Sequence, residues 1–393
     1  MGGTISGATA IAGIGETAYH RRGGSPDAEF KMALQATIAA AEDAGLDVRA
    51  IDGFSSFSGD RNDGARLATA LDLPDLKYSA TVGVSGHAAA AIANAAAAVA
   101  AGYADYVVAF RALAQGQFGR FGQFGGYGGG AGTVDTVGFP GSWTVPYGVL
   151  APVQTYTLRT TRFLHDHGIH QDALRAISLA CYHHAQRNPR AVMYGRPLEA
   201  DDYDSSRWIV EPQHLFDCCM ENDCAAAVIV TTAERARDLR HDAALILGIA
   251  TGSDRRQFPA AQGGPDFATS NMKNVARRAF AMAGVTPADV DVAQLYDNFT
   301  GAVLMSIVEH GFCTPEEVNE FVTFENLTAP GGRLPVNTSG GNIAEAYVHG
   351  IGLVLEAVRQ LRGTSTSQVD GAEVALATAA PLAFVTGSII LGR

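Results

Sequence analysis

The order of strands and helices in this chain occurs twice, and this repetition limits the fold more than any other feature. Residues 8–15 are typical of a short buried strand, followed by a predicted helix over 27–44 and a strand over 51–57. A strand near 80–83 then leads through Ser85-Gly86-His87 into a helix that ends near residue 101, and the strand 106–110 follows. Gly13-x-Gly15 alone is a weak dinucleotide signal, because no third glycine opens a helix at the required spacing.

The second part of the chain has the same order. A helix is predicted over 271–283, a strand over 290–296 and a further helix over 301–309. Ser339-Gly340-Gly341 is then expected to open one long helix that continues to residue 361, as Ser85-Gly86-His87 does in the first part. The strands 225–231 and 384–391 close the two parts. Two similar halves with alternating strands and helices predict a duplicated α/β fold with layered helices and sheets.

An insertion separates the parts, and it gives the domain boundaries. The predicted N-terminal half consists of residues 1–115 and 205–240, and the predicted C-terminal half consists of residues 241–393. Between them lies an inserted loop domain, residues 116–204, which is rich in glycine and aromatic residues. The insertion begins with a low-complexity run in which Phe118, Phe121, Phe124 and Tyr127 recur every three residues. Such a run is typical of a flexible loop that packs its rings locally. The alternative is a cover for an apolar substrate, or a surface on which a partner docks.

Charge and composition exclude several classes of protein. The formal net charge is −12, which argues against nucleic acid as the main partner because phosphate binding needs a basic face. No apolar run reaches the length of a membrane span, and the N-terminus lacks the basic and apolar regions of a signal peptide. The five cysteines are odd in number and form no Cys-x-x-Cys pair. We therefore expect a reduced cytoplasmic protein.

Residues 337–350 carry the most informative motif, Asn-Thr-Ser-Gly-Gly-Asn-Ile-Ala-Glu-Ala-Tyr-Val-His-Gly. This motif resembles the C-terminal signature of the thiolase superfamily, specifically of its sterol-carrier-protein thiolase or non-specific lipid-transfer branch. The family pattern is Asn-x-x-Gly-Gly-x-x-Ala-x-Gly-His-Pro-x-Gly, so Tyr347 stands at the histidine position and Val348 at the proline position. In the predicted helix Tyr347 lies one to two turns from the start, and His349 lies on another face.

Two further places carry the same resemblance. Gln294-Leu-Tyr-Asp-Asn-Phe-Thr is similar to the branch's Glu-x-His-Asp-x-Phe, with Tyr296 at the histidine position and Asp297 and Phe299 retained. The segment from 196 to 227 is similar to the family pattern that leads into an Asp-Gly-Ala-Ala strand, with Cys224 in place of the glycine. The resemblance covers nearly the whole chain and implies the five-layered α-β-α-β-α, pseudo-two-fold thiolase architecture.

The resemblance also shows what is missing. A thiolase uses a nucleophilic cysteine at the start of the helix that here begins near Ser85, yet residues 81–88 contain no cysteine, and neither do residues 375–393. Without a thiolate the acyl-enzyme route is closed. Ser85 as a nucleophile lacks a matched base and orienting acid in the sequence.

Two histidine-to-tyrosine changes leave paired phenols where the family has paired imidazoles. Retro-aldol cleavage of a β-hydroxy acyl-CoA needs a base for the hydroxyl proton and a donor for the thioester enolate, with no covalent enzyme intermediate. We assign Tyr296 and Tyr347 as this acid and base pair without deciding which does which. Asp297, His349 and His87 are the candidate supporting residues. At the helix start, Asn337, Gly340 and Gly341 are the candidate substrate-binding residues.

The resulting hypothesis is an acyl-CoA aldolase, a carbon–carbon lyase that resembles enzymes shortening a steroid side chain to a ketone and propionyl-CoA. It implies no cofactor beyond the CoA of the substrate, a homodimer, and a small OB-fold, zinc-ribbon acyl-CoA-binding protein as partner. The alternative is a non-catalytic acyl-CoA or lipid carrier on an inactivated thiolase fold, in which the tyrosines only fill space.

Other candidate residues are weaker. His165, His167 and His170 could hold a metal by their number, but their spacing places at most two imidazoles on one helical face. Cys218, Cys219 and Cys224 lack the spacing of zinc ligands and are expected to be small buried residues. A set of basic residues suits the phosphates of CoA, although solvated surface charge explains them as well: Arg255, Arg256, Lys273, Arg277 and Arg278.

Overall fold

A mixed β-sheet runs through the whole molecule in the computed structural model, which describes residues 5–57, 59–83, 86–118, 144–255, 257 and 266–393. The main path of this sheet has the order β10-β11-β12-β9-β1-β8-β5-β3-β4, and β2 pairs with β8. The strands are β1 (Thr9–Glu16), β2 (His20–Arg21), β3 (Gly53–Phe57), β4 (Tyr78–Val82), β5 (Val107–Ala114), β6 (Trp208–Val210), β7 (Gln213–His214), β8 (Asn222–Thr232), β9 (Ala244–Gly252), β10 (Val292–Gln294), β11 (Val374–Ala379) and β12 (Thr386–Gly392).

The α-helices vary from one turn to sixteen residues. They are α1 (Glu29–Ala44), α2 (Gly64–Ala70), α3 (His87–Ala100), α4 (Gln115–Phe118), α5 (Pro152–His167), α6 (Asp172–Ala185), α7 (Ala200–Ser205), α8 (Ala233–Ala236), α9 (Lys273–Ala283), α10 (Thr300–Glu309), α11 (Val318–Phe321), α12 (Phe324–Leu327), α13 (Gly341–Ala344) and α14 (Ile351–Arg362). None of them is long and apolar enough to cross a membrane, within the residues that the structure describes.

The two halves of the sheet have matching topologies. In the N-terminal half β4, β3 and β5 are parallel, and β8 pairs antiparallel with both β5 and β1. In the C-terminal half β10 and β11 are parallel, and β12 pairs antiparallel with both β11 and β9. A short antiparallel pairing of β1 with β9 joins the halves. The duplicated α/β fold that the sequence predicts is therefore confirmed.

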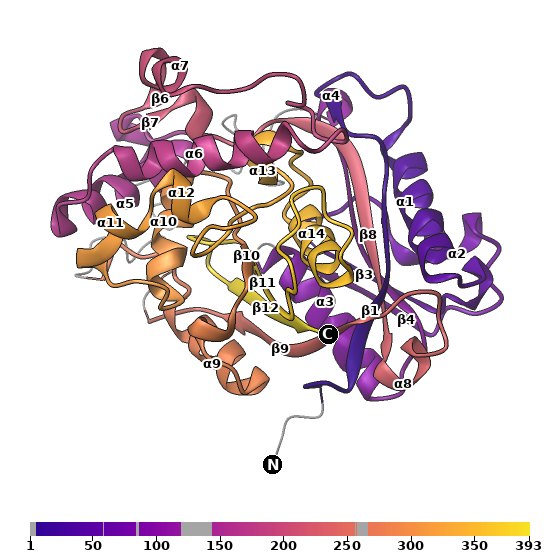
Figure 1. Cartoon of the computed structure of the whole chain (residues 1–393). Coiled ribbons are helices and arrows are strands. Elements are labelled where there is room, and N and C mark those ends of the chain that lie inside the picture. The colour runs from indigo at the N-terminus through magenta and orange to yellow at the C-terminus, as the bar shows by residue number, and fades with distance from the viewer. Residues whose placement is uncertain (1–4, 58, 84–85, 119–143, 256, 258–265) are drawn as a thin grey trace.

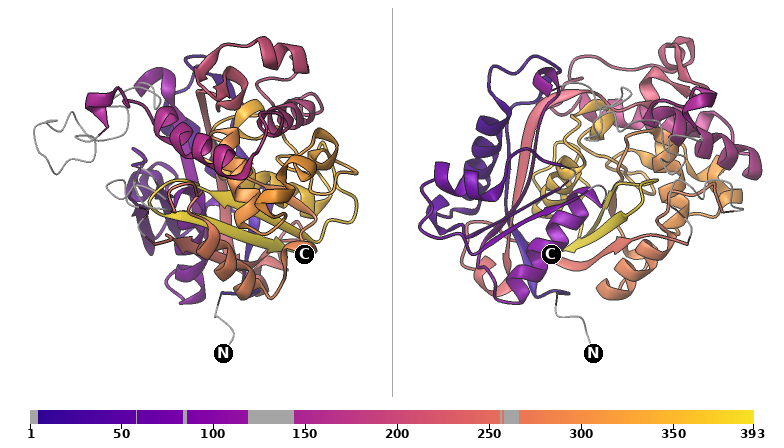
Figure 2. Two further views of the ribbon diagram at one scale, coloured as in Figure 1. Left: turned by 90° about the vertical axis from the view of Figure 1, so that its left-hand side faces the viewer. Right: turned by 180° about the vertical axis from the view of Figure 1, so that it is seen from behind.

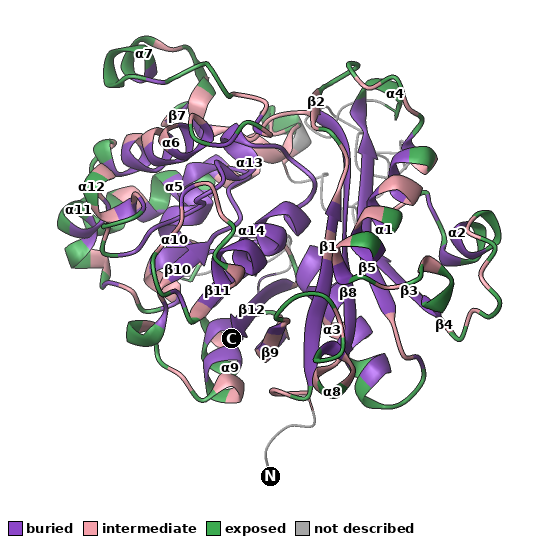
Figure 3. Ribbon diagram, turned by 45° about the vertical axis from the view of Figure 1, so that its right-hand side comes forward, coloured by how far each residue is buried: buried purple, intermediate pink, exposed green. Residues whose placement is uncertain are grey.

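Helices form the layers around these two half-sheets (Figures 1 and 2). The helix α1 covers the outer face of the N-terminal half and α9 that of the C-terminal half, while α3 and α14 share one apolar core with strands of both halves. Figure 3 shows the consequence for burial, because α14 is buried along almost its whole length and α1 exposes one side. The order of layers is helix, sheet, helix, sheet, helix, as the resemblance implies.

The glycines of the Gly13-x-Gly15 pattern serve helix packing. A Cβ atom at Gly13 would lie 2.3 Å from the carbonyl oxygen of Ala40, and one at Gly15 would lie 2.3 Å from that of Ala36. The backbone of α1 therefore approaches β1 more closely than any side chain would allow. Gly248 repeats this arrangement in the second half, where a Cβ atom would lie 2.2 Å from the carbonyl oxygen of Ala279 on α9.

The described end of the insertion packs on the C-terminal half. Helix α6 contacts α10, α12 and α13, and its apolar residues belong to the same buried cluster as those of α10. The backbone N–H groups of Val192 and Met193 donate to the carbonyl oxygens of Glu345 and Ala344. The part after residue 143 is therefore continuous with the core of the C-terminal half. Phe121, Phe124 and Tyr127 lie outside the described residues.

The prediction of one long helix from Ser339 to residue 361 is wrong. Helix α13 spans only Gly341–Ala344, and α14 begins at Ile351 after Gly350, whose φ is +83°. Between them the N–H of Tyr347 donates to the side chain of Asn222 on β8, at 2.8 Å, and is thus withdrawn from the helical pattern. Tyr347 and His349 consequently lie in a buried turn.

Candidate active site

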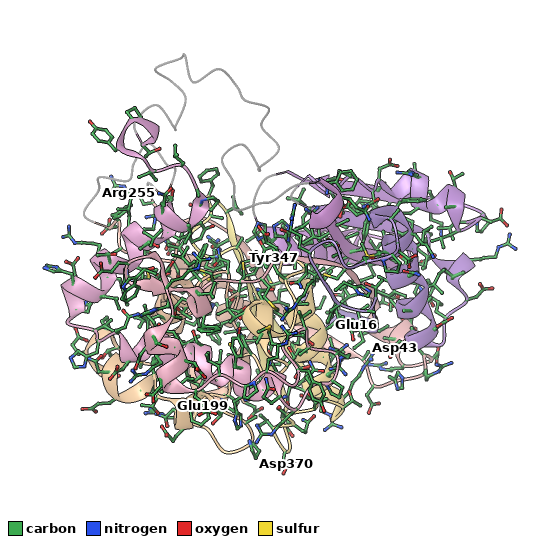
Figure 4. The ribbon with its side chains drawn as sticks, turned by 90° about the horizontal axis from the view of Figure 1, so that it is seen from above. Glu16, Asp43, Glu199, Arg255, Tyr347 and Asp370 are labelled. Carbon is green, nitrogen blue, oxygen red and sulfur yellow. The ribbon has the colours of Figure 1, made fainter. Side chains whose placement is uncertain are left out.

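Two buried tyrosines meet at the junction of the halves. Tyr296 follows β10 after one residue, and Tyr347 lies in the turn between α13 and α14. Their hydroxyl oxygens are 3.0 Å apart, and their ring planes cross at 75°. Leu113 of β5 and Leu353 of α14 belong to the same apolar cluster. Seen from above, Tyr347 lies between the N-terminal half and the remainder of the molecule (Figure 4).

The backbone at Tyr296 is fixed by side chains from two other segments. Its N–H donates to the hydroxyl of Thr378 on β11 at 2.8 Å. The preceding Leu295 exchanges two hydrogen bonds with the side-chain amide of Asn337, which accepts from its N–H at 2.7 Å and donates to its carbonyl at 2.9 Å. The ring itself lies against Gly350, where a Cβ atom would be only 2.5 Å from Cδ2. This phenol is therefore placed by rigid neighbours.

The turn that carries Tyr347 is held on two sides. Asn222 accepts from its N–H, and the thiol of Cys224 donates to its carbonyl oxygen at 3.7 Å. On the other side, the buried carboxyl group of Glu345 accepts from Asn188 at 2.8 Å and from Ser339 at 2.5 Å. Burial, together with the negative charge of Glu16, raises the pKa of Glu345 to about 8.

Asp297 also holds this turn. Its carboxylate accepts hydrogen bonds from the backbone N–H groups of Asn342 at 2.9 Å and Ile343 at 3.2 Å, and so caps the first turn of α13. Burial raises the pKa of Asp297 to about 6, although these hydrogen bonds oppose the shift. The candidate supporting residue thus acts on the backbone that leads to Tyr347.

The three candidate substrate-binding residues occupy the same framework. Asn337 is fully buried with its amide bound to Leu295. A Cβ atom at Gly340 would lie 2.9 Å from that of Ala185, and one at Gly341 would lie 2.2 Å from a carboxylate oxygen of Asp297. The contacts of these residues are therefore with protein groups that shape the turn.

The two candidate imidazoles stack beside the tyrosines. The rings of His87 and His349 are 4.9 Å apart at an interplanar angle of 24°. His87 also contacts the ring of Tyr296 at 5.4 Å, and His349 that of Tyr347 at 5.1 Å. Burial, assisted by the positive charge of Arg111, lowers the pKa of His87 to about 3 and that of His349 well below its ordinary value. Both imidazoles are therefore neutral at pH 7.

The thiols do not have the environment of a nucleophile. Cys219 is partly buried and packs against the tyrosine cluster, but burial raises its pKa well above the ordinary value. Burial likewise raises the pKa of Cys218 to about 12. A thiol in such surroundings is not a thiolate at neutral pH. Ser85 lies outside the described residues. Within the described part of the chain, no three His, Cys, Asp or Glu side chains are grouped to hold a metal ion.

The basic residues proposed for CoA lie at the surface. Arg255, Lys273, Arg277 and Arg278 are exposed, and Arg278 donates to the carbonyl oxygen of Thr251 at 3.1 Å. Arg256 lies outside the described residues. At the start of the insertion, the guanidinium group of Arg61 lies 3.9 Å from the ring centroid of Phe118.

Several residues of this site have no motif in the sequence. Arg111 is buried, 3.3 Å from Asp60, and donates to the carbonyl oxygen of Phe57 at 2.9 Å. Asn222 and Glu345 hold the Tyr347 turn. A charged residue within the apolar run of β5 was the available signal for Arg111, since an arginine there requires a buried partner.

Comparison with known proteins agrees with this architecture. The family model "Thiolase C-terminal domain-like" matches residues 254–393. The chain is 37% identical to the steroid side-chain-cleaving aldolase of Thermomonospora curvata, over 99% of this chain and 98% of that protein. It is 38% identical to the 17-hydroxy-3-oxo-4-pregnene-20-carboxyl-CoA lyase of Mycobacterium tuberculosis, over 99% of this chain and 100% of that protein. The solved Ltp2-ChsH2(DUF35) aldolase matches with a TM-score of 0.91 and 36% identity, covering 100% of this chain and 99% of that one.

The duplicated fold and the site at the junction of its halves define a thiolase-like protein whose two signature histidines are tyrosines. The chain belongs to the thiolase superfamily, in the sterol-carrier-protein-like branch that contains the steroid side-chain-cleaving aldolases. The family resemblance expected from the motifs is confirmed, and so is the assignment to the carbon–carbon lyases.

Proposed function

We propose that this lyase catalyses retro-aldol cleavage of a β-hydroxy acyl-CoA, with Tyr296 and Tyr347 as its acid and base. The substrate is a steroid side-chain CoA thioester, and the products are a ring ketone and propionyl-CoA. The observation that carries the proposal is the 3.0 Å contact between the two hydroxyl oxygens at the family's two histidine positions. The full-length similarity to an aldolase and to a CoA lyase supports the reaction class.

The proton balance suits a pair of neutral phenols. The substrate hydroxyl gives its proton to one tyrosine while that tyrosine passes its own proton across the 3.0 Å contact to the second. In the same step the bond between the α and β carbons breaks, the β carbon becomes a carbonyl, and the electron pair moves toward the thioester, which gains enolate character. The second tyrosine delivers its own proton to the α carbon as this charge develops, so neither phenol carries two protons. Neither phenol has to be ionised at the start or at the end, and the balance is the same in either direction.

We further propose that the protein works as a homodimer with a small OB-fold, zinc-ribbon acyl-CoA-binding partner. The similar solved protein is an Ltp2-ChsH2(DUF35) aldolase, and its DUF35 component supports a partner of this class. For the dimer, β4 forms the edge of the main sheet path and alternates between half-buried and exposed residues. An edge strand of this kind offers unpaired backbone groups to a second copy. Size-exclusion chromatography with light scattering, with and without the partner, tests both statements.

The function is tested by mass spectrometry of the products. A β-hydroxy steroid side-chain CoA thioester is incubated with wild type, Tyr296→Phe and Tyr347→Phe, each with and without the partner. We expect propionyl-CoA and ketone from wild type and a loss of at least about 100-fold in each variant, since each phenol carries a proton in the reaction. If the thioester binds but no form cleaves it under any condition, the aldolase is refuted and a non-catalytic carrier remains.

A further inference from the structure

The imidazole of His87 is buried against the ring of Tyr296, and one of its nitrogens has no hydrogen-bond partner in the described part of the chain. The side chain is 6% exposed, and Nδ1 has no partner among the described residues. Its ring contacts those of Tyr296 and His349 at 5.4 and 4.9 Å. A buried polar atom without a partner costs free energy, and native proteins contain few of them. Here the imidazole that carries the atom packs against the ring of Tyr296, whose hydroxyl contacts that of Tyr347.

The backbone of His87 is held in an uncommon conformation. Its φ is +41°, in a region that side chains other than glycine rarely adopt. The residue is the first of the fourteen-residue helix α3, after Gly86 with φ +73°. The N–H of Gly86 donates to the carbonyl oxygen of Val385, which ties the start of α3 to the C-terminal half. Strain of this kind persists where surrounding contacts fix it, and it is concentrated at functional sites.

The surroundings keep this imidazole neutral. Arg111 is the charged group behind it, and Asp60 lies 3.3 Å from that guanidinium group. Because the charge of Arg111 and burial both disfavour a second proton, the ring carries one N–H. The tautomer with that hydrogen on Nδ1 presents a donor at the unpartnered atom. The positive end of the α3 dipole lies at the same residue and favours negative charge nearby.

We propose that His87 is a further catalytic residue, whose Nδ1–H donates a hydrogen bond to the thioester oxygen of the acyl-CoA and stabilises the enolate. The proposal rests on the proposed function and names the group that receives the electron pair. During the reaction the pair of the broken carbon–carbon bond moves onto the thioester oxygen, which accepts from the imidazole. When the α carbon takes its proton from one of the two tyrosines, the electrons return from the oxygen and the thioester carbonyl is restored. His87 itself gains and loses no proton.

The contact is tested first without cleavage. Propionyl-CoA labelled with ¹³C at the thioester carbon is bound to wild type, His87→Phe, His87→Gln and His184→Phe. His184 is the control, because it is also a buried histidine with a pKa lowered to about 3, but it lies on α6 and its Nε2 accepts a hydrogen bond from the backbone N–H of Ala329. We expect a downfield shift of the carbonyl signal in wild type and His184→Phe. His87→Phe should lose it, and His87→Gln, with an amide donor, should keep part of it.

Turnover gives the second measurement, with urea denaturation to verify that each variant is folded. We expect kcat to fall by about 100- to 1,000-fold in His87→Phe, with a smaller change in KM, because the hydrogen bond is strongest in the transition state. An unchanged carbonyl signal and unchanged kcat in a folded His87 variant would overturn the proposal while the aldolase stands. If wild type shows the shift, His87→Phe loses it and no form cleaves substrate, the contact stands and the proposed function falls.

Discussion

Replacing Gly350 by alanine tests whether the position of Tyr296 limits catalysis. Gly350 precedes α14 with φ +83°, and a Cβ atom there would lie 2.5 Å from Cδ2 and 2.7 Å from Cε2 of the Tyr296 ring. An ordinary contact is at least 3.4 Å, so the ring and the new methyl group have to separate by about 0.9 Å. The ring is buried and its backbone is fixed at both neighbouring segments, so the shift falls on the hydroxyl that faces Tyr347.

Two costs follow from this geometry. An alanine with positive φ costs about 1–2 kcal/mol, and overpacking a buried site typically costs about 1–3 kcal/mol more. We expect Gly350→Ala to lower the free energy of unfolding by roughly 2–5 kcal/mol. A displacement of about 1 Å at a reacting group is enough to lower kcat about 100-fold.

Gly363 is the matched control, because it ends the same helix with φ +71° and a Cβ atom there would meet no heavy atom of the described residues within 4 Å. Gly363→Ala therefore carries only the conformational cost of about 1–2 kcal/mol, and its kcat should be unchanged. Urea denaturation and product formation are measured on both variants. If folded Gly350→Ala cleaves substrate as fast as Gly363→Ala, the placement of the Tyr296 ring does not limit the reaction and the reasoning fails.

Three further predictions concern the groups around the pair. Between pH 5 and 8 native Glu345 holds a proton that the unfolded chain releases, so this group makes the free energy of unfolding fall as pH rises. In urea titrations Glu345→Gln should reduce the dependence of that free energy on pH by up to about 1.4 kcal/mol per pH unit. The same dependence in wild type and variant would contradict the raised pKa. Asn222→Ala removes the acceptor of the Tyr347 N–H and should lower kcat about tenfold and the free energy of unfolding by about 1–3 kcal/mol. An unchanged kcat would show that the turn keeps its position without this hydrogen bond. Turnover should survive iodoacetamide, because Cys219 is largely protonated; an inactivation that substrate prevents would show that a thiol takes part.

The fold was predictable because its signals are local and repeated. The strands and helices, the glycines that end α1 and α9, and the order of the two halves all follow from periodicity and turn residues. The break between α13 and α14 was not predictable in the same way. Residues 341–361 have a helical pattern, but the N–H of Tyr347 bonds to Asn222, which is 125 residues away in the sequence. A tertiary hydrogen bond of that range leaves no periodic signal.

The site residues differ in the same way in how far the sequence could predict them. The two tyrosines could be selected from the sequence because they depart from a family motif, and in the structure their hydroxyl groups are in contact. The roles of Asp297 and Asn337 were not visible, because a carboxylate that caps a helix and an amide that pairs with a strand end have the same letters in the sequence as ligand-binding groups. Only the partners of such side chains in the structure show whether they hold the backbone or face a ligand.

The loss of the thiol and the gain of the phenols form one consistent change. Cleavage without an acyl-enzyme needs groups that move protons in a water-poor interior and do not acquire a lasting charge there. Two phenols 3.0 Å apart satisfy this, and so do two imidazoles whose pKa values are lowered by burial and by Arg111. A cysteine thiolate or an imidazolium ion in the same volume would each add an unpaired charge. The site therefore gathers two phenols and two neutral imidazoles, and the charge of Arg111 is paired with that of Asp60.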